Sequence, residues 1–205
     1  MEKQNRQYDK EALLIFVKNL QKGKVKTRLA ETIGEARALD IYRELLTITK
    51  SVVEPLEIAR QVWYSDYIDE DDLWPGVAYE KRVQEGKNLG MRMQMAFRRA
   101  FGSGFEKVII IGSDCAEIST SLLRQAFDRL NNHGAVIGPA ADGGYYLLGT
   151  NRFYPDIFEL DEWSTASVYD RTIKQFHKKR ISYAVLAELN DIDTEADLKD
   201  SSLVL

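Results

Sequence analysis

The sequence predicts a single-domain α/β fold in which a mostly parallel sheet is flanked by helices. Short apolar runs rich in β-branched residues, of which residues 108–111 are the clearest, are typical of parallel strands covered on both faces. These runs alternate along the 205 residues with segments whose apolar positions recur at helical spacing. No internal repeat or linker interrupts the pattern, so we expect one domain over residues 11–205 after a flexible segment at 1–10.

The same patterns place each element. Apolar runs predict strands at residues 12–18, 59–64, 77–84, 108–111, 135–138, 145–149 and 181–186. Helical spacing of apolar residues predicts helices at residues 33–53, 89–101, 121–131 and 167–178, with Ser119 as a helix cap. Five acids and Pro75 make residues 66–76 a surface loop. Ligands of such folds bind beyond the carboxyl ends of the strands, so the loops after residues 17, 111 and 138 are the informative ones.

Composition narrows the class of protein. With 28 basic and 32 acidic residues the net charge is −4, which argues against a nucleic-acid-binding protein. The apolar stretches are too short for a membrane span and no secretory leader is recognisable, so we expect a cytoplasmic protein. The one cysteine, Cys115, excludes an intrachain disulfide and a cysteine-based zinc cluster. The sequence leaves monomer and homodimer open.

The loop after the first predicted strand carries five cations and no acid. They are Lys18, Lys22, Lys24, Lys26 and Arg28. It lacks the second glycine and Lys-Ser/Thr pair of a Walker A loop, but Gly23 lets backbone amides turn towards a phosphate, and Lys26 and Arg28 can neutralise phosphate oxygens. The alternative is a solvated basic loop. Its position after a buried strand favours phosphate binding.

Carboxylates at two places suit a divalent cation. Asp114 follows the most buried strand, where a hard cation that bridges substrate phosphates needs one or two carboxylates; the alternative is a cap of the following loop. Asp193 can supply the second carboxylate, although Asp193 or Thr194 also suits the N-cap of a short helix. Cys115 is interpreted as a packed residue rather than a nucleophile.

Residues 138–146 combine a tight turn with aromatic residues. An Asp-Gly hairpin explains Asp142-Gly143-Gly144 structurally. The hypothesis that we favour is that Gly143 and Gly144 let a ring or sugar lie against the backbone beside Tyr145, while Asp142 faces the reaction centre.

Two further segments have both a structural and a functional interpretation. Gly90 and Arg92 lie where a glycine-punctuated loop enters a helix, which suits a polar ligand or an ordinary loop-to-helix junction. Trp163 is either a packing residue or a lid over substrate.

Taken together, these segments resemble a known family. The matching pieces are Lys18 with residues 23–29, residues 89–93, 111–115, 138–146, 163–165 and 191–194. They are similar to the DUF2064 group of GT-A-type transferases, relatives of molybdenum-cofactor guanylyltransferase and 2-phospholactate guanylyltransferase. The resemblance implies a nucleotide-diphospho-sugar transferase fold, phosphates held by Gly23, Lys26 and Arg28, and a Mg²⁺ or Mn²⁺ held by Asp114. We also expect Lys24 to contact the substrate. Leu20 and Ala116 stand where the family has proline, which loosens both loops.

The resemblance also implies a function. We expect a metal-dependent transferase that uses a nucleotide-sugar donor to glycosylate a small acceptor, with Lys26 and Arg28 stabilising the leaving group and Asp142 accepting a proton. Family members linked to arsenosugar synthesis favour sugar transfer. One alternative is a nucleotidyltransferase that joins a nucleoside triphosphate to a phosphorylated acceptor and releases pyrophosphate. The other is a non-catalytic nucleotide-binding domain.

Overall fold

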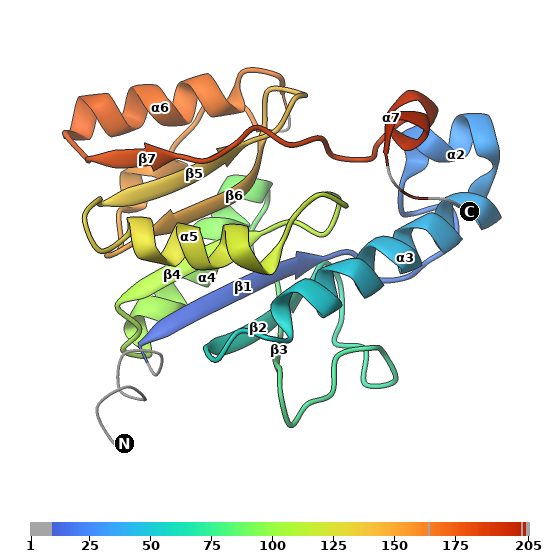
Figure 1. Ribbon diagram of the computed structural model, residues 1–205, viewed down its shortest axis with the longest axis horizontal. Coiled ribbons are helices and arrows are strands. Elements are labelled where there is room, and N and C mark those ends of the chain that lie inside the picture. Colours follow the sequence, from blue (N-terminus) through green and yellow to red (C-terminus); the bar gives the residue numbers. More distant parts are fainter. Residues whose placement is uncertain (1–9, 164, 202, 204–205) are drawn as a thin grey trace.

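A seven-stranded sheet runs through the middle of the protein (Figure 1). The computed structural model describes residues 10–163, 165–201 and 203. The strands are β1 (Glu11–Val17), β2 (Ala59–Tyr64), β3 (Glu80–Val83), β4 (Lys107–Ile111), β5 (Ala135–Pro139), β6 (Tyr145–Thr150) and β7 (Tyr183–Val185), in the order β3-β2-β1-β4-β6-β5-β7. Only β6 runs against the others, pairing antiparallel with both β4 and β5. The predicted α/β fold with a mostly parallel sheet is confirmed.

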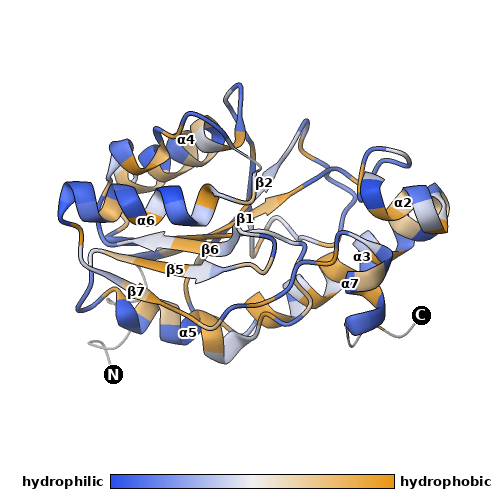
Figure 2. Cartoon of the chain, turned by 90° about the horizontal axis from the view of Figure 1, so that it is seen from above, coloured by the Kyte–Doolittle hydropathy of each residue, from blue (hydrophilic) through white to orange (hydrophobic). Residues whose placement is uncertain are grey.

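Helices cover both faces of the sheet (Figure 2). Their bounds are α2 (Thr27–Ile33), α3 (Glu35–Val53), α4 (Leu89–Gly102), α5 (Thr120–Arg129), the 3-10 helix η1 (Pro155–Phe158), α6 (Val168–Lys179) and α7 (Glu195–Asp200). Helices α3 and α5 lie on one face, and α4, α6 and η1 on the other. Helix α2 lies beside α7 at the end to which β1 and β4 point (Figure 1).

Side chains of alternate residues in the central strands pack into two separate hydrophobic cores, one under each helical layer. In β1, Leu13 and Ile15 pack with the α3 and α5 side, whereas Ala12 and Leu14 pack with the α4 and α6 side. All four are completely buried. A strand buried on both faces must be apolar at every position, which explains the uninterrupted run from which β1 was predicted.

In place of the one helix predicted at residues 33–53, the structure has two consecutive helices, α2 and α3, the first of which begins earlier in the sequence. Gly34, with φ of +86°, separates α2 from α3. Residues 27 and 28 were expected in the basic loop, but they begin α2, which buries Leu29 against the same core as α3. The predicted cap is confirmed, since the Ser119 hydroxyl accepts the Leu122 N–H at 3.2 Å. The flexible segment expected at residues 1–10 falls, except for Lys10, outside the described residues.

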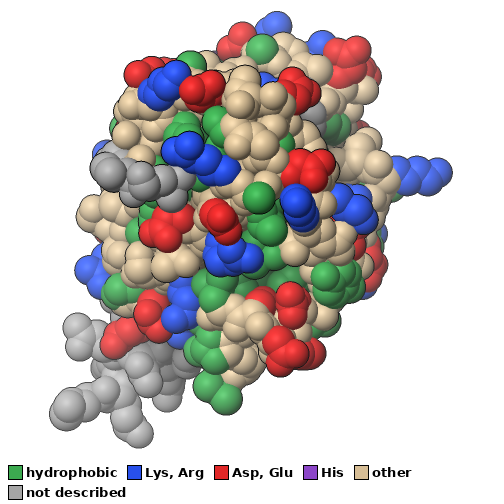
Figure 3. Space-filling view, turned by 90° about the vertical axis from the view of Figure 1, so that its right-hand side faces the viewer, with side chains coloured by type: hydrophobic (Ala, Val, Ile, Leu, Met, Phe, Trp, Pro, Cys, Tyr) green, Lys and Arg blue, Asp and Glu red, His purple; other side chains and the backbone are tan. Residues whose placement is uncertain are grey.

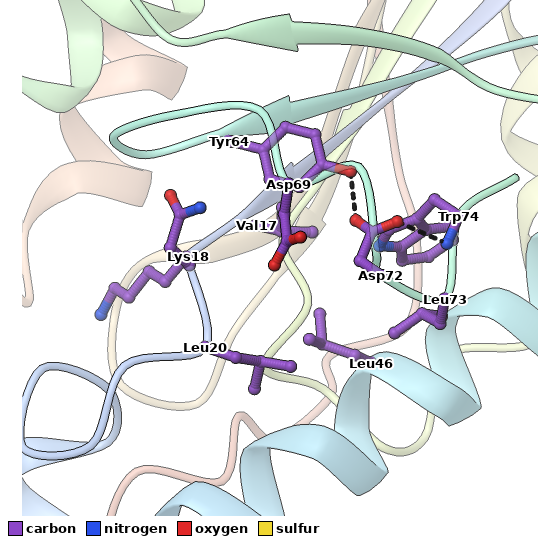
Figure 4. A pocket seen from close by; sticks show the side chains of 10 residues that line it. Val17, Lys18, Leu20, Leu46, Tyr64, Asp69, Asp72, Leu73 and Trp74 are labelled. Carbon is purple, nitrogen blue, oxygen red and sulfur yellow. Dashed lines mark hydrogen bonds between the residues drawn. The ribbon is translucent and has the colours of Figure 1, made fainter. Parts of the chain in front are cut away.

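The segment predicted as the surface loop 66–76 carries a buried anchor (Figure 4). Trp74 is only 1% exposed, and its backbone N–H donates to Asp72 Oδ1 at 2.9 Å. The Tyr64 hydroxyl and the Lys81 ammonium also bind the Asp72 carboxylate. Leu20, which replaces the family's proline, packs against this core beside Leu46. Asp72 therefore fixes the loop to β2 and β3, the strands on either side of it.

Candidate functional site

Sheet topology brings three predicted loops to one edge. β1 and β4 are parallel neighbours, so the loops after Val17 and Ile111 leave the sheet side by side. β6 runs the opposite way, so its first residues lie where β4 ends, and the Gly112 N–H donates to the Tyr146 carbonyl at 3.2 Å. The turn at residues 140–144 therefore faces both loops.

The segment after β7 brings the C-terminal aspartates to the same edge. It runs back across the strand ends, with the Leu189 N–H bound to the Pro139 carbonyl at 3.1 Å and the Ile192 N–H bound to the Asp114 carbonyl at 2.9 Å. It then enters α7, which Thr194 caps through a reciprocal hydrogen-bond pair with Asp197. Because Thr194 supplies the cap, the Asp193 side chain is free to face the first loop.

Lys26 lies between the two predicted metal ligands. Its ammonium contacts Asp114 Oδ1 and lies 3.0 Å from Asp193 Oδ1, and its side chain is 2% exposed. Burial opposes the charge on Lys26, but the Asp114 and Asp193 carboxylates outweigh burial and raise the Lys26 pKa above its usual value. Arg28 binds the other oxygen of Asp193 and is mostly exposed. Burial opposes the charge on Asp193, yet Lys26 and Arg28 lower its pKa.

A third carboxylate, Asp191, lies in the same group. Burial and the neighbouring Asp114 raise the pKa of Asp191 to about 7, although Lys26 acts in the opposite direction. The motif at residues 191–194 contains Asp191, but only Asp193 of that motif was predicted as a metal ligand. The structure adds it to the acidic side of the site.

Tyr42 is a site residue that the sequence did not reveal. It comes from the middle of α3 and is 1% exposed. Its hydroxyl accepts the Lys18 N–H at 2.8 Å and lies 3.0 Å from Ser113 Oγ, so it links the first loop to the loop that carries Asp114. In the sequence Tyr42 is one more member of the apolar stripe of a helix, a position with no functional signal.

These loops surround a cleft of about 830 Å³. Such a volume suits a small-molecule ligand. Of the predicted site residues, the following line it: Lys26, Arg28, Arg92, Asp114, Asp142, Gly144, Tyr145, Trp163 and Asp193. Unpredicted lining residues include Phe16, Ser65, Gln84 and Asp191. Seen from the side of α2 and α7, basic and acidic side chains alternate over this face with hydrophobic ones between them (Figure 3).

Four predicted residues lie outside the lining of the cleft: Gly23, Lys24, Gly90 and Gly143. Gly23 has φ of +77° and lies against the Glu35 side chain, and Lys24 is exposed. Gly90 is covered by Trp163, since a Cβ added at Gly90 would lie 2.2 Å from the Trp163 ring. A Cβ at Gly143 would lie 2.0 Å from the Ala166 carbonyl. The close approach that Gly143 permits is to the protein's own backbone.

Asp142 lies at the tip of the turn between β5 and β6 and is exposed to solvent. One of its oxygens, Oδ1, accepts the Gly144 N–H at 2.8 Å, which leaves the other oxygen without that constraint. Asp142 therefore both shapes the turn, as the hairpin interpretation predicted, and lines the cleft.

Cys115 is buried, and burial raises its pKa to about 12, so its thiol stays protonated and packs as an apolar residue.

The donor set at this edge fits a hard divalent cation. Asp114 and Asp193 supply carboxylate oxygens, the ligands that Mg²⁺ and Mn²⁺ prefer. Among residues 10–163, 165–201 and 203, no group of three or more His, Cys, Asp or Glu side chains is arranged to hold a metal ion. A cation here would thus combine one or two carboxylates with ligand phosphates and water, as Mg²⁺ sites commonly do.

The fold and site define a class of protein, the nucleotide-diphospho-sugar transferase type of α/β domain. A crystal structure of a protein classed as a nucleotide-diphospho-sugar transferase from Desulfovibrio desulfuricans G20 is 33% identical, with a TM-score of 0.88 over 93% of this chain and 85% of that one. The family model described as "Uncharacterized protein conserved in bacteria (DUF2064)" matches residues 48–165. The chain belongs to the DUF2064 family, as its motifs indicated.

More distant structures share the fold alone. 4-Diphosphocytidyl-2C-methyl-D-erythritol synthase from Anaerococcus prevotii is 12% identical, with a TM-score of 0.63 over 97% of both chains. A Mycobacterium tuberculosis H37Rv protein in complex with manganese is 15% identical, with a TM-score of 0.57 over 94% of this chain and 97% of that one. A search among curated proteins finds no match. None of the helices in the described part of the chain is long and apolar enough to cross a membrane.

Proposed function

We propose that the protein is a divalent-metal-dependent transferase that moves a sugar from a nucleotide-sugar donor to a hydroxyl of a small acceptor. One observation carries the proposal: the cations of the first loop and the carboxylates after β4 and β7 meet in a single cleft. A diphosphate bound between them would have its charge met from both sides.

Each residue then has a role. Lys26 and Arg28 bind the diphosphate oxygens, and Asp114 and Asp193 would hold Mg²⁺ or Mn²⁺. When bound, that ion supplies further positive charge for the leaving nucleoside diphosphate. The bond between the anomeric carbon and the phosphate oxygen breaks, its electron pair leaves with the nucleoside diphosphate, and the acceptor oxygen bonds to the anomeric carbon. Asp142 takes the proton of the acceptor hydroxyl.

The side of the cleft around Asp142 favours an uncharged acceptor. Asp142 stands there with the aromatic residues Tyr145 and Trp163. A phosphorylated acceptor would approach a carboxylate, whereas a sugar-like acceptor would find a proton acceptor and aromatic faces. This favours sugar transfer over the nucleotidyltransferase alternative, in which an acceptor phosphate attacks the α-phosphorus of a nucleoside triphosphate.

The non-catalytic alternative has less support. It rested on Leu20 and Ala116 replacing prolines of the family pattern. Leu20 packs against the core beside Leu46, so apolar packing takes over the stiffening that proline would supply. The charged groups that the chemistry requires are present and lie together.

Product analysis separates the three functions. The protein is incubated with Mn²⁺ and panels of nucleotide sugars, nucleoside triphosphates and small acceptors carrying hydroxyl or phosphate groups. We expect release of a nucleoside diphosphate together with a glycosylated acceptor. Pyrophosphate release would establish the nucleotidyltransferase, and nucleotide binding without any product would establish the non-catalytic domain.

A further inference from the structure

The ammonium of Lys26 is placed where a cation bridging Asp114 and Asp193 would sit. It contacts one oxygen of each carboxylate, and its side chain is 2% exposed. These two carboxylates and one ammonium carry a net charge of −1, and Arg28, which also binds Asp193, brings the group close to neutral. A second, divalent cation entering the same position would meet the ammonium at short range, and like charges at such distances repel strongly in a partly buried site.

The Lys26 ammonium can move from the two carboxylates into the neighbouring cleft. The Lys26 backbone lies in the left-handed region, with φ of 48° and ψ of 45°, immediately before α2. This conformation is sparsely populated by residues with side chains and tends to occur at functional sites. The side chain itself has a flexible four-carbon stem, so its ammonium can leave the carboxylates without movement of α2. The cleft beside it is where the proposed diphosphate would lie.

Arg28 differs from Lys26 in its position relative to the two carboxylates. Within the described part of the chain, Arg28 forms an ion pair with Asp193 but none with Asp114, and its side chain is 61% exposed. It can bind Asp193 and a phosphate together without crossing the position between the carboxylates. Lys26 is therefore the residue whose charge competes directly with a metal ion.

We propose that Lys26 is an internal counter-ion that keeps the carboxylate pair closed to divalent cations until a ligand phosphate draws its ammonium away. This inference rests on the proposed function for the identity of that phosphate. Its consequence is that nucleotide and metal bind cooperatively, each raising the affinity for the other by the same factor. The carboxylates then hold a metal ion tightly only when a diphosphate is present.

Mn²⁺ binding measured without nucleotide tests the inference directly. Mn²⁺ is titrated by calorimetry into the wild type, Lys26→Met and Lys22→Met. Lys22 is an exposed residue of the same loop, so Lys22→Met controls for the loss of one positive charge. We expect Lys26→Met to bind Mn²⁺ on the order of tenfold more tightly than the wild type, and Lys22→Met to bind like the wild type.

A Lys26→Met variant that binds Mn²⁺ no more tightly than the wild type would overturn the inference. Thermal unfolding in EDTA shows whether each variant folds, and Lys26→Gln, which keeps a hydrogen-bond donor, replaces Lys26→Met if the latter does not. A second titration in saturating nucleoside diphosphate should tighten Mn²⁺ binding in the wild type and much less in Lys26→Met. If the wild type binds no nucleotide, the proposed function fails, while the nucleotide-free titration still decides the role of Lys26.

Discussion

Lys26 and Asp193 lie 167 positions apart in the chain, and their side chains meet in the cleft. Neither residue is remarkable alone, since a lysine in a basic loop and an aspartate before a helix are both common on protein surfaces. Two local features make the contact. The left-handed backbone at Lys26 aims one side chain inward, and the Thr194 cap frees the other.

Asp142 is the residue whose substitution should separate binding from chemistry. In Asp142→Asn the side-chain oxygen can still accept the Gly144 N–H, so the turn should keep its shape. The amide cannot take a proton from the acceptor, so we expect turnover to fall by roughly 10²–10⁴-fold. Nucleotide affinity, measured by calorimetry, should stay close to that of the wild type. Wild-type turnover in this variant would remove Asp142 from the chemistry.

At the scale of elements, the turn between β5 and β6 is locked to the start of α6. The Tyr169 N–H donates to the Gly143 carbonyl at 3.0 Å, and the Ala166 backbone occupies the space where a Gly143 side chain would lie. Since Asp142 and Gly144 flank Gly143, this contact fixes one wall of the cleft.

Gly143→Ala should therefore disrupt both the turn and the segment after Trp163. The new Cβ would lie 2.0 Å from the Ala166 carbonyl, at a residue with φ of +87°. We expect a loss of at least about 2 kcal/mol in the free energy of unfolding, measured in urea. Gly76→Ala is the matched control, because a Cβ there meets nothing within 4 Å, and its effect should be under about 0.5 kcal/mol. Equal effects of the two substitutions would refute the close packing of the turn.

The elements could largely be predicted from the sequence, and the exceptions have physical causes. Strands such as β1 and β4 are buried on both faces, so their apolar runs are unbroken. α2 was missed because its seven residues carry little periodicity and follow a dense run of cations. The buried position of Trp74 was missed because its anchor, Asp72, is also what makes the segment look like a polar loop.

The candidate site could be predicted in part for a related reason. Asp114 comes soon after β4, and Lys26 and Arg28 lie in the segment that follows β1, so topology places both segments at the carboxyl edge. Tyr42 and Asp191 reach the site through tertiary contacts made from a helix and from a returning segment, and no local pattern encodes such contacts. Gly143 does permit a close approach to its backbone, but the neighbour is the Ala166 backbone rather than a ring or sugar. The partner of such an approach cannot be predicted from one segment of the sequence.

At the scale of the whole molecule, the acidic site should make stability depend on pH. The folded protein raises the pKa of Asp191 from 3.8 to about 7, so between these pH values the folded state binds a proton that the unfolded state has lost. Stability from this group is complete below about pH 4 and declines as the pH rises towards 7. The lowered pKa of Asp193 has the opposite effect, because its stabilisation is complete above its ordinary value of 3.8 and is lost as the pH falls below that value.

Asp191→Asn should flatten this profile. We expect the wild type, in EDTA, to lose about 1–3 kcal/mol of unfolding free energy between pH 4 and pH 8 through Asp191, and the variant to lose correspondingly less. Urea denaturation at several pH values measures the effect, with the exposed Asp128→Asn as control. A variant with the wild-type slope would show that Asp191 titrates normally.

The central claim is that one cleft binds a nucleotide diphosphate through the first loop and a divalent cation through Asp114. Thermal denaturation with UTP, GTP and UDP-glucose, with and without Mn²⁺, tests it most directly, with Asp114→Asn beside the wild type. A ligand at 100 times its Kd adds about 2.7 kcal/mol. We expect stabilisation of the wild type that depends on Mn²⁺ for at least one nucleotide and is lost in Asp114→Asn. No stabilisation with any nucleotide, or the same Mn²⁺-dependent stabilisation in Asp114→Asn, would contradict it.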